Sequence, residues 1–197
     1  MKKTLTIGSV ASMMTMAVLT ANAQNLLLNG NFNTGDYTGW YTYAADGTMA
    51  NTITTTTPTF DGSPNAQMVS GDTTYRDALG QAVSIGGNQK YNISFDYYVN
   101  VVPTSFAISV TYDDAGNNYL GYEFPTGVLT SAGGWETYSG NFTTPANTAS
   151  LKLEFELYSA ATVNLDNVSV TPAPEPTTFA LLGSAGLGLL VLRRRRV

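Results

Sequence analysis

Two pairs of neighbouring carboxylates are the residues of this sequence whose type and spacing come nearest to catalytic chemistry. Glycoside hydrolysis uses two carboxyl groups that flank the bond to be cleaved. Glu154 and Glu156 alternate along an expected strand, so both point the same way, ~7 Å apart, and do not flank a bond. Asp113 and Asp114 lie in a turn sequence, where Asp bonds to its own backbone. The sequence contains neither histidine nor cysteine. We therefore expect no catalytic activity and place a glycoside hydrolase last among three functions.

Aromatic side chains are the better candidates, because their faces stack on sugar rings while their hydroxyls bond to sugar hydroxyls. The chain has 12 tyrosines and 2 tryptophans. Tyr91 and Tyr97 share the parity of a buried strand face and are assigned to the core. The predicted ligand-binding residues have the opposite parity or lie in or beside loops: Tyr75, Tyr98, Tyr119 and Tyr122. At each of them the alternative is a half-buried strand tyrosine without a ligand.

Hydrophobic alternation predicts the elements that position these side chains. Apolar residues recur at every second position over 91–99, 106–112 and 151–157, which is typical of half-buried antiparallel strands. Further strands are expected at 26–32, 40–44, 51–57, 66–70, 78–85, 119–124, 135–143 and 162–171. Because many short strands alternate with Gly, Pro and Asn turns and no helical segment lies between them, we predict an all-β jelly-roll β-sandwich.

The last expected strand contains an irregularity. Val163 and Leu165 share one parity, whereas Val168 and Val170 have the other. A β-bulge between positions 166 and 167 would produce this change of register. The alternative is that one part of the segment faces the opposite layer, and parity alone leaves both open.

Charge is distributed unevenly between the body and the two ends. Residues 24–176 contain three basic side chains, Arg76, Lys90 and Lys152, and all fourteen acidic ones, which gives a net charge of −11. Such a body repels phosphate backbones, so nucleic acid is excluded as a partner. It suits neutral polysaccharide or divalent cations. The lack of cysteine also excludes disulfides and thiolate metal sites.

Both ends carry export features. Lys2 and Lys3 precede an apolar stretch over 5–19 and the small residues Ala21 and Ala23, which predicts a secretory signal peptide over 1–23. At the other end an apolar run over 179–192 is shorter than the ~20 residues that a spanning helix usually needs. Because the run is apolar all round and arginines that follow it can snorkel, we predict a short transmembrane helix with a cytoplasmic C-terminus. A core helix is the alternative, and it lacks a polar face.

The tail combines three features in order: a Pro-Glu-Pro break, the apolar run and a terminal arginine cluster. The residues concerned are Pro174, Glu175, Pro176, Arg193, Arg194, Arg195 and Arg196. Together they resemble the PEP C-terminal sorting signal of Gram-negative surface proteins. The resemblance implies recognition by an exosortase, cleavage near Pro174–Pro176, transient anchoring in the inner membrane and delivery to the cell surface or extracellular matrix. It also implies an association with exopolysaccharide and biofilm. We expect three parts: 1–23, a body over 24–172, and a sorting and anchor segment over 173–197.

Three segments of the body carry a second resemblance: NLLLNGNF at 25–32, GWETY at 134–138 and VNLDNVSV at 163–170. Their order and spacing resemble galactose-binding-like carbohydrate-binding modules. The resemblance implies that Trp40 and Trp135 pack inside the sandwich. The fold hosts many functions, so sugar binding is an expectation to be argued from the site.

Such modules often hold a structural calcium between the turn after the first strand and the last strand. Carried over to this chain, the resemblance implies Asn33 and Asp166 as calcium ligands. Asn31 and Asn33 stand where the family commonly has Asp and Glu, and the loss of carboxylates weakens calcium binding. The alternative is that Asp166 braces the irregular strand by accepting backbone N–H bonds.

Two further functional hypotheses follow. The first is an exported, non-catalytic surface protein that binds extracellular polysaccharide through exposed aromatic side chains. The second is a structural or adhesive matrix protein on the same fold, with no defined sugar site. They differ in whether the exposed aromatic side chains gather on one sheet face or loop rim.

Overall fold

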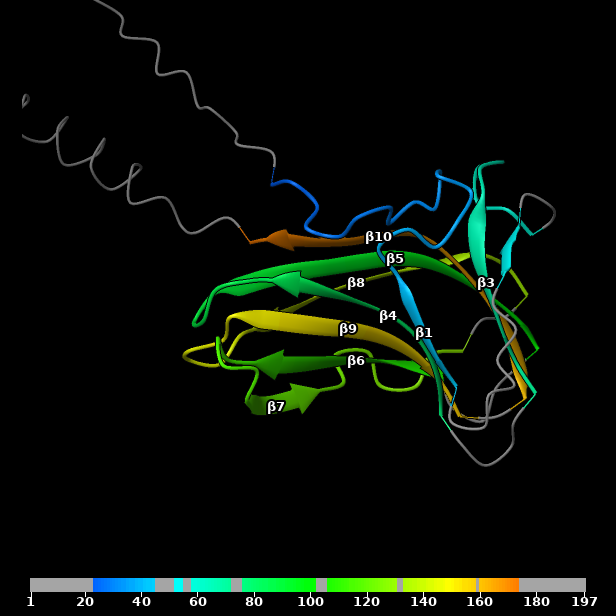
Figure 1. The fold of residues 1–197 in the computed structure, drawn as a ribbon. Helices are drawn as coiled ribbons and strands as arrows, with labels where there is room; N and C mark the ends of the chain where they lie inside the picture. Colours follow the sequence, from blue (N-terminus) through cyan, green and yellow to red (C-terminus); the bar gives the residue numbers. More distant parts are fainter. Residues whose placement is uncertain are drawn as a thin grey trace, which may run out of the picture.

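Two β-sheets form the body of the chain and face one another as two layers (Figure 1). The computed structural model describes residues 23–44, 52–54, 58–71, 76–101, 106–130, 133–158 and 160–173. Within these residues every regular element is a strand. The predicted all-β jelly-roll β-sandwich is confirmed.

The two sheets interleave in sequence, as expected when strands alternate between layers. Sheet A has the order β1-β4-β9-β6-β7 and sheet B the order β2-β3-β10-β5-β8, with antiparallel pairing throughout. The strands are β1 (Tyr41–Ala44), β2 (Thr52–Thr54), β3 (Asn65–Ser70), β4 (Asp77–Ser84), β5 (Lys90–Val101), β6 (Phe106–Asp113), β7 (Tyr119–Glu123), β8 (Glu136–Thr143), β9 (Ser150–Leu157) and β10 (Ala161–Pro172).

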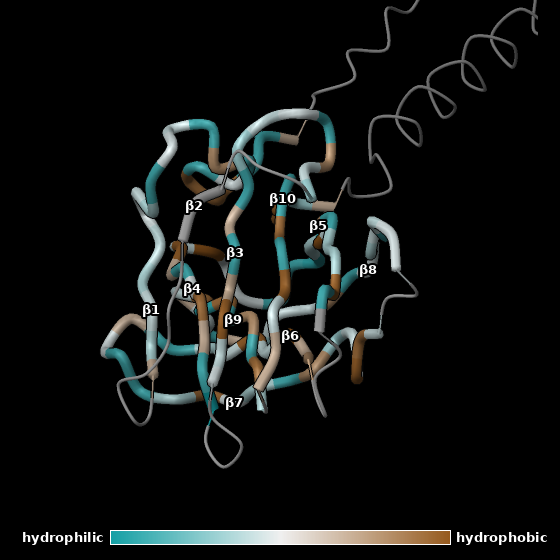
Figure 2. The backbone as a smooth tube through the Cα atoms, turned by 90° about the vertical axis from the view of Figure 1, so that its right-hand side faces the viewer, coloured by the Kyte–Doolittle hydropathy of each residue, from teal (hydrophilic) through white to brown (hydrophobic). Residues whose placement is uncertain are grey.

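The core lies between the two sheets. Apolar and polar residues alternate along the strands, and Figure 2 shows the corresponding brown and teal bands along β10. Phe155 of β9 contacts the rings of Phe95 from sheet B and Phe106 from its own sheet. Each such fully buried side chain stabilises the fold by about 1.5–3 kcal/mol relative to exposure. Trp40 is buried against Phe32, as expected.

The irregularity in the last strand is a β-bulge. The pairing of β10 with β5 shifts between Asp166 and Ser169, and Asn167 adopts a left-handed φ of 49°. As a result Val163, Leu165, Val168 and Val170 are all buried on one face despite their change of parity. Asp166 consequently points outward from sheet B, opposite Asp96 of β5.

The predicted strand over 26–32 is wrong. Residues 27–31 form turns, because Asn29 and Phe32 adopt left-handed φ angles of 49° and 52° that an extended strand does not allow. The segment still lies along β10, since the Leu26 N–H donates to the Val170 carbonyl at 2.8 Å and the Val168 N–H donates to the Gly30 carbonyl at 2.8 Å. An added Cβ at Gly30 would lie 2.1 Å from the Val168 carbonyl oxygen, so only glycine permits this approach.

Candidate functional site

The outer face of sheet A carries a row of polar and aromatic side chains that runs across its strands, with two pockets on the β7 side. Its centre is β9, flanked by small residues on β4 and β6, with aromatic residues on the two edge strands β1 and β7. Four strand spacings separate the two edges, or ~19 Å. We call this surface the groove; its residues are Tyr41, Tyr43, Arg76, Gly80, Ser109, Tyr119, Tyr122, Phe124, Glu154, Glu156 and Tyr158.

The register of the sheet places small side chains beside the two glutamates of β9. Glu154 of β9 pairs with Gly80 of β4 and with Ser109 of β6, and Glu156 pairs with Ala78 and Ala107 in the same two strands. Neighbouring strands therefore present small side chains beside each carboxylate. The aromatic side chains of the groove come from the edge strands and from residues at the strand ends.

Glu156 is the polar centre of the groove. It is 1% exposed, and its carboxylate accepts hydrogen bonds of 2.6 Å each from Arg76, Ser109 and Tyr158. A buried carboxylate is stable only when it is paired and hydrogen-bonded, and these three donors meet that requirement. Burial, followed by the bond to Glu156, raises the pKa of Tyr158 to about 12. The Tyr158 hydroxyl thus stays a donor at physiological pH.

Arg76 connects the two carboxylates of β9. Its guanidinium lies 2.6 Å from Glu156 and 3.2 Å from Glu154, and it stands over the ring of Tyr43 at 5.2 Å. Burial alone would lower the pKa of Arg76, but the charges of Glu156 and Glu154 outweigh it and raise that pKa above its usual value. One cation among two carboxylates leaves this cluster with a formal charge of −1.

Gly80 gives Tyr41 its position at the β1 edge. The Tyr41 hydroxyl donates to Glu154 at 3.0 Å, across the intervening strand β4. An added Cβ at Gly80 would lie 2.7 Å from both Cζ and Oη of Tyr41, and 2.9 Å from Cγ of Glu154. Only glycine therefore lets the tyrosine ring lie across β4. Burial and the neighbouring Glu154 raise the pKa of Tyr41.

Two adjoining pockets form the β7 half of the groove. The first, of about 340 Å³, is polar and is lined by Arg76, Ser109, Thr111, Tyr119, Tyr122, Phe124, Glu156 and Tyr158. The second, of about 510 Å³, is lined by Ala107, Phe124, Gly127, Val128 and Tyr158. Phe124 and Tyr158 belong to both. Flat aromatic faces beside charged donors and acceptors are the chemistry that binds a polyhydroxylated ring.

The predicted ligand-binding tyrosines divide between the sheets. Tyr119 and Tyr122 lie on β7 in the groove and are 60% and 61% exposed. Tyr98 lies on the outer face of sheet B, half-buried against Trp135 at 6.0 Å. Tyr75 lies outside the described residues. The structure thus brings two of the four together, and their role as ligand contacts stays a prediction.

Sequence reasoning missed Arg76, Tyr41, Tyr43 and Tyr158 as members of the groove. Tyr41 and Tyr43 are spaced i, i+2, a signal that both face the same side of a strand. Tyr158 shares the parity of the two glutamates. No local signal marks Arg76, whose partners lie 78 and 80 residues away in sequence.

The outer face of sheet B is built differently. Asp166 is fully buried there, and its carboxylate accepts from the Asn167 N–H at 2.7 Å, while the Ser63 hydroxyl, which donates to Asp61, lies 3.5 Å away. Burial raises the pKa of Asp166 to about 6; the Asn167 bond opposes this shift, and the charges of Asp61 and Asp96 add to it. Asp166 therefore braces the bulge, as the alternative to calcium binding predicted.

Trp135 is not a core residue. Glu136, the first residue of β8, pairs with Tyr97, whose side chain points inward, so the residue before it faces outward. Trp135 is half-buried between Tyr98 and Phe60, with a ring distance of 5.6 Å to Phe60. The expectation that it packs inside the sandwich is wrong, because the inward parity begins one residue later.

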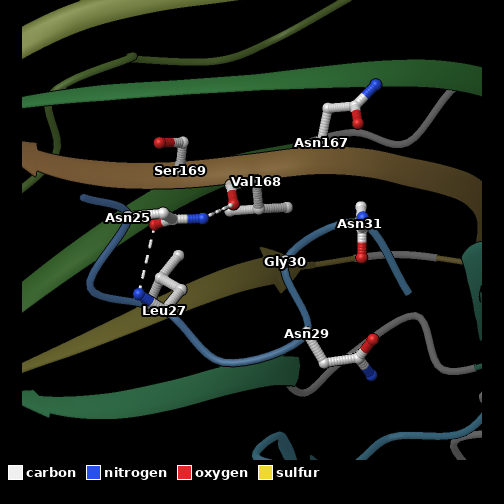
Figure 3. Close-up of a pocket in the computed structure, with 8 residues that line it drawn as sticks. All are labelled: Asn25, Leu27, Asn29, Gly30, Asn31, Asn167, Val168 and Ser169. Atoms are coloured by element: carbon white, nitrogen blue, oxygen red, sulfur yellow. Dashed lines mark hydrogen bonds between the residues drawn. The ribbon is translucent and has the colours of Figure 1, made fainter. Parts of the chain in front are cut away.

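The proposed calcium ligands do not form a complete site. Asn33 is exposed on the turn after Phe32, and no described contact joins it to the buried Asp166. The pocket beside them, of about 390 Å³, is lined by Asn25, Leu27, Asn29, Gly30, Asn31, Asn167, Val168 and Ser169 (Figure 3). It offers amides and no carboxylate. Across the described ranges no three acidic, His or Cys side chains are grouped to hold a metal.

The amide of Asn25 is already engaged in that pocket. Its Nδ2 donates to the Val168 carbonyl at 2.9 Å, and its Oδ1 accepts from the Leu27 N–H (Figure 3). The same Oδ1 also accepts from the Val170 N–H. This side chain fastens the N-terminal segment to β10. Calcium binding therefore stays a prediction from resemblance. The amide groups of this pocket do not favour it, because they carry no negative charge and the Asn25 amide is already hydrogen-bonded.

The signal peptide and the sorting tail lie almost entirely outside the described residues. The predicted helix over 179–192 and the residues from Pro174 to Arg196 are therefore untested by the geometry. In the part of the chain that the structure covers, no helix has the length and apolarity needed to cross a membrane.

Two interleaved five-stranded antiparallel sheets with an aromatic groove across one of them define a jelly-roll binding module. The chain belongs to the carbohydrate binding domain family, whose profile matches residues 24–162. Residues 172–196 match the PEP-CTERM protein-sorting motif, which implies export and membrane-associated sorting. Both resemblances noted in the sequence are confirmed. No curated protein sequence matches the chain.

Solved structures confirm the fold. The xylan-binding CBM22-1 domain of Paenibacillus barcinonensis Xyn10C matches with a TM-score of 0.61 and 17% identity, over 79% of this chain and 99% of that domain. The CBM22-1-GH10 modules of Clostridium thermocellum xylanase 10B match at 0.62 and 19%, over 76% and 29%. Tailspike protein 4 of bacteriophage CBA120 matches at 0.63 and 12%, over 76% and 21%. The chain thus spans less than a third of these last two structures.

Proposed function

We propose that the protein binds a neutral polysaccharide chain along the groove of sheet A. The observation that carries this proposal is the combination of exposed aromatic rings at both edges with a hydrogen-bonding centre. Tyr41 and Tyr43 stand at one edge and Tyr122 and Phe124 at the other, with Glu156 and its donors between them. A chain laid across the strands meets a stacking surface at each end and polar groups in the middle.

The charge of the groove supports a neutral ligand. The cluster of Arg76, Glu154 and Glu156 has a formal charge of −1, and the body as a whole carries −11. A polyanionic glycan is repelled by both, whereas hydroxyl groups bond equally well to carboxylate and guanidinium. The matched family, whose printed description is carbohydrate binding, supports the same class of ligand.

The position of the exposed aromatic side chains favours a binding module over a structural matrix protein. Six of them border a single face, that of sheet A: Tyr41, Tyr43, Tyr119, Tyr122, Phe124 and Tyr158. A matrix protein without a sugar site has no need to gather exposed rings on one face.

The protein acts without catalysis in this proposal. Glu154 and Glu156 project from the same strand and are both held by Arg76, an arrangement that supports ligand binding and not the protonation of a glycosidic bond. The sorting motif supports processing by an exosortase in the inner membrane of a Gram-negative bacterium and delivery to the cell surface. The expected partners are therefore the exosortase and extracellular polysaccharide.

Affinity electrophoresis of the exported protein tests the proposal. Gels containing arabinoxylan, glucomannan, mixed-linkage β-glucan or the acidic polymer alginate are compared. We expect at least one neutral polymer to slow migration and alginate to have no effect. Unchanged migration in every gel would support the matrix role instead.

A further inference from the structure

An apolar pocket with exposed side chains lies beside the polar centre of the groove. Its lining residues are Ala107, Phe124, Gly127, Val128 and Tyr158, around about 510 Å³. Val128 is 60% exposed and Phe124 45%. Leaving such side chains in water forgoes the stabilisation that burial would give. An apolar group from outside the chain that binds in the pocket would supply this burial.

The loop that bears Val128 is fixed on both sides. Leu129 is buried, and its N–H donates to the Phe106 carbonyl at 2.7 Å. The Ile108 N–H donates to the Thr126 hydroxyl at 3.2 Å, and the Tyr138 hydroxyl donates to the Pro125 carbonyl at 2.8 Å. Because these hydrogen bonds fix Thr126 on one side and Leu129 on the other, the Val128 side chain is held at the surface. The pocket is thus formed before any ligand arrives, which lowers the entropic cost of binding.

The pocket is continuous with the polar half of the groove. Phe124 and Tyr158 line both, and the Tyr158 hydroxyl donates to Glu156. A sugar ring that bonds to the polar centre therefore has the apolar pocket beside it. A substituent on that ring is therefore the group of the ligand that lies nearest to the apolar pocket.

The chemistry of the lining selects the substituent. A free hydroxyl would lose its hydrogen bonds to water among apolar side chains. A carboxylate would also be repelled by the net negative cluster around Arg76. A small acyl ester is uncharged, carries no donor and presents a methyl group, so it loses little on entering.

We propose that this pocket receives the O-acyl groups of an acylated neutral polysaccharide, acetyl esters being the simplest case. The inference rests on the proposed function, since the acyl group is carried by the polymer bound in the groove. It adds a specificity: the protein distinguishes acylated from unmodified stretches of the same polymer. Val128 is the specificity-determining residue, because it has the largest side chain among the residues that line the apolar pocket alone.

The test compares chemically acetylated and unmodified forms of arabinoxylan, glucomannan and mixed-linkage β-glucan by affinity electrophoresis of the exported protein. We expect the acetylated form of the bound polymer to hold the protein more tightly, by about fourfold for each methyl group buried. Val128→Asp should abolish that preference, so that the affinity for the acetylated form no longer exceeds the affinity for the unmodified form. Leu28→Asp is the matched control, because Leu28 is 65% exposed and lies outside the groove; it should alter neither.

Three results would overturn the inference. Equal affinity for acetylated and unmodified polymer would remove the acyl specificity while leaving the proposed function intact. Failure to bind any polymer in either form would remove the proposed function and the acyl specificity with it. A dimer that sedimentation shows to dissociate on Val128→Asp would mean that a second copy of the chain covers the pocket.

Discussion

Glu156 of sheet A and Asp166 of sheet B are both buried on the outer faces of their sheets, and they are stabilised in opposite ways. Glu156 of sheet A is 1% exposed and is paired with Arg76 at 2.6 Å. Asp166 of sheet B is fully buried, accepts from the neutral N–H of Asn167, and lies near the charges of Asp61 and Asp96. In the described part of the chain no cation contacts it. Equal burial therefore has different consequences, which depend on the neighbouring charge.

This difference indicates which face is built for a ligand. On sheet B the polar side chains bond to one another: Asn164 donates to Asn65 at 2.7 Å, and Asn167 donates to Asp96 at 3.0 Å. On sheet A the charged cluster borders a pocket, and exposed rings stand beside it. Both buried carboxylates form their bonds within the protein, and the two faces differ in Arg76 and Tyr158, which are partly exposed and border the pocket on sheet A.

Asp166→Asn should have the largest effect on stability. The pKa of Asp166 is raised to about 6 in the folded protein, from 3.8. The folded state therefore binds this proton more tightly than the unfolded state. The resulting stabilisation is complete below about pH 4 and is lost as pH rises through about 6. We expect the neutral variant to be more stable than the natural protein at pH 7.5, by up to roughly 3 kcal/mol, and no more stable at pH 3.5.

Urea unfolding of both proteins between pH 3.5 and 7.5 measures this effect. The difference between the two isolates Asp166 from the exposed carboxylates Asp36, Asp61 and Asp114, whose pKa values hydrogen bonds lower. A variant that is less stable than the natural protein at pH 7.5 would show that the ionised carboxylate has a compensating partner.

Glu156→Gln should act in the opposite direction. The amide keeps the shape of the side chain but removes the charge that Arg76 and the Tyr158 hydroxyl face. Because hydrogen bonds to a charged group are worth about 1.5–3 kcal/mol, we expect a loss of about 2 kcal/mol at pH 7. The same unfolding experiment measures it. An unchanged or increased stability would mean that the burial cost of this carboxylate exceeds the gain from its partners.

Gly80→Ala should weaken glycan binding more than it alters folding. The added Cβ would displace the Tyr41 ring, 2.7 Å away, and break its bond to Glu154. Loss of one hydrogen bond and of the ring position predicts a reduction in affinity of about fivefold, or ~1 kcal/mol. Gly71→Ala is the matched control, since its Cβ meets nothing within 4 Å. Equal affinities for the two variants would exclude Tyr41 from the binding surface.

Removal of calcium with EDTA should have the smallest effect on stability. The side-chain amides of Asn25 and Asn167 already form hydrogen bonds within the protein, and no described contact joins Asn33 to Asp166. We therefore expect melting curves with and without EDTA to coincide. A shift of several degrees would show that calcium is bound in the folded state and would restore the site implied by resemblance.

The strands could be predicted because alternation is a local property of the sequence. Leu151, Leu153 and Phe155 were assigned to the core from parity, and the change of parity before Val168 marked the bulge. The segment 26–32 reads equally as a strand, but left-handed φ angles at Asn29 and Phe32 turn it. Apolar content does not encode such dihedral angles.

The groove could be predicted only in part, because its members come from distant segments. Tyr119 and Tyr122 were found as loop-side tyrosines. Arg76 joins the site only through pairing of β4 with β9, a register set by the whole sheet. Tyr98 points outward from its strand, as a ligand contact would, but it lies on sheet B, whose outer polar groups bond among themselves. Parity gives the face of a strand and not the identity of its sheet.

The measurement that tests the central claim most directly is calorimetric titration of one bound neutral polymer with the variants Tyr122→Ala and Tyr98→Ala. Both remove one tyrosine from an outer sheet face, and only Tyr122 lies in the groove. We predict that Tyr122→Ala raises Kd roughly 30-fold, a loss of about 2 kcal/mol typical of an aromatic residue that dominates a binding surface, while Tyr98→Ala leaves Kd unchanged. A larger loss with Tyr98→Ala than with Tyr122→Ala would contradict the account and move the binding face to sheet B.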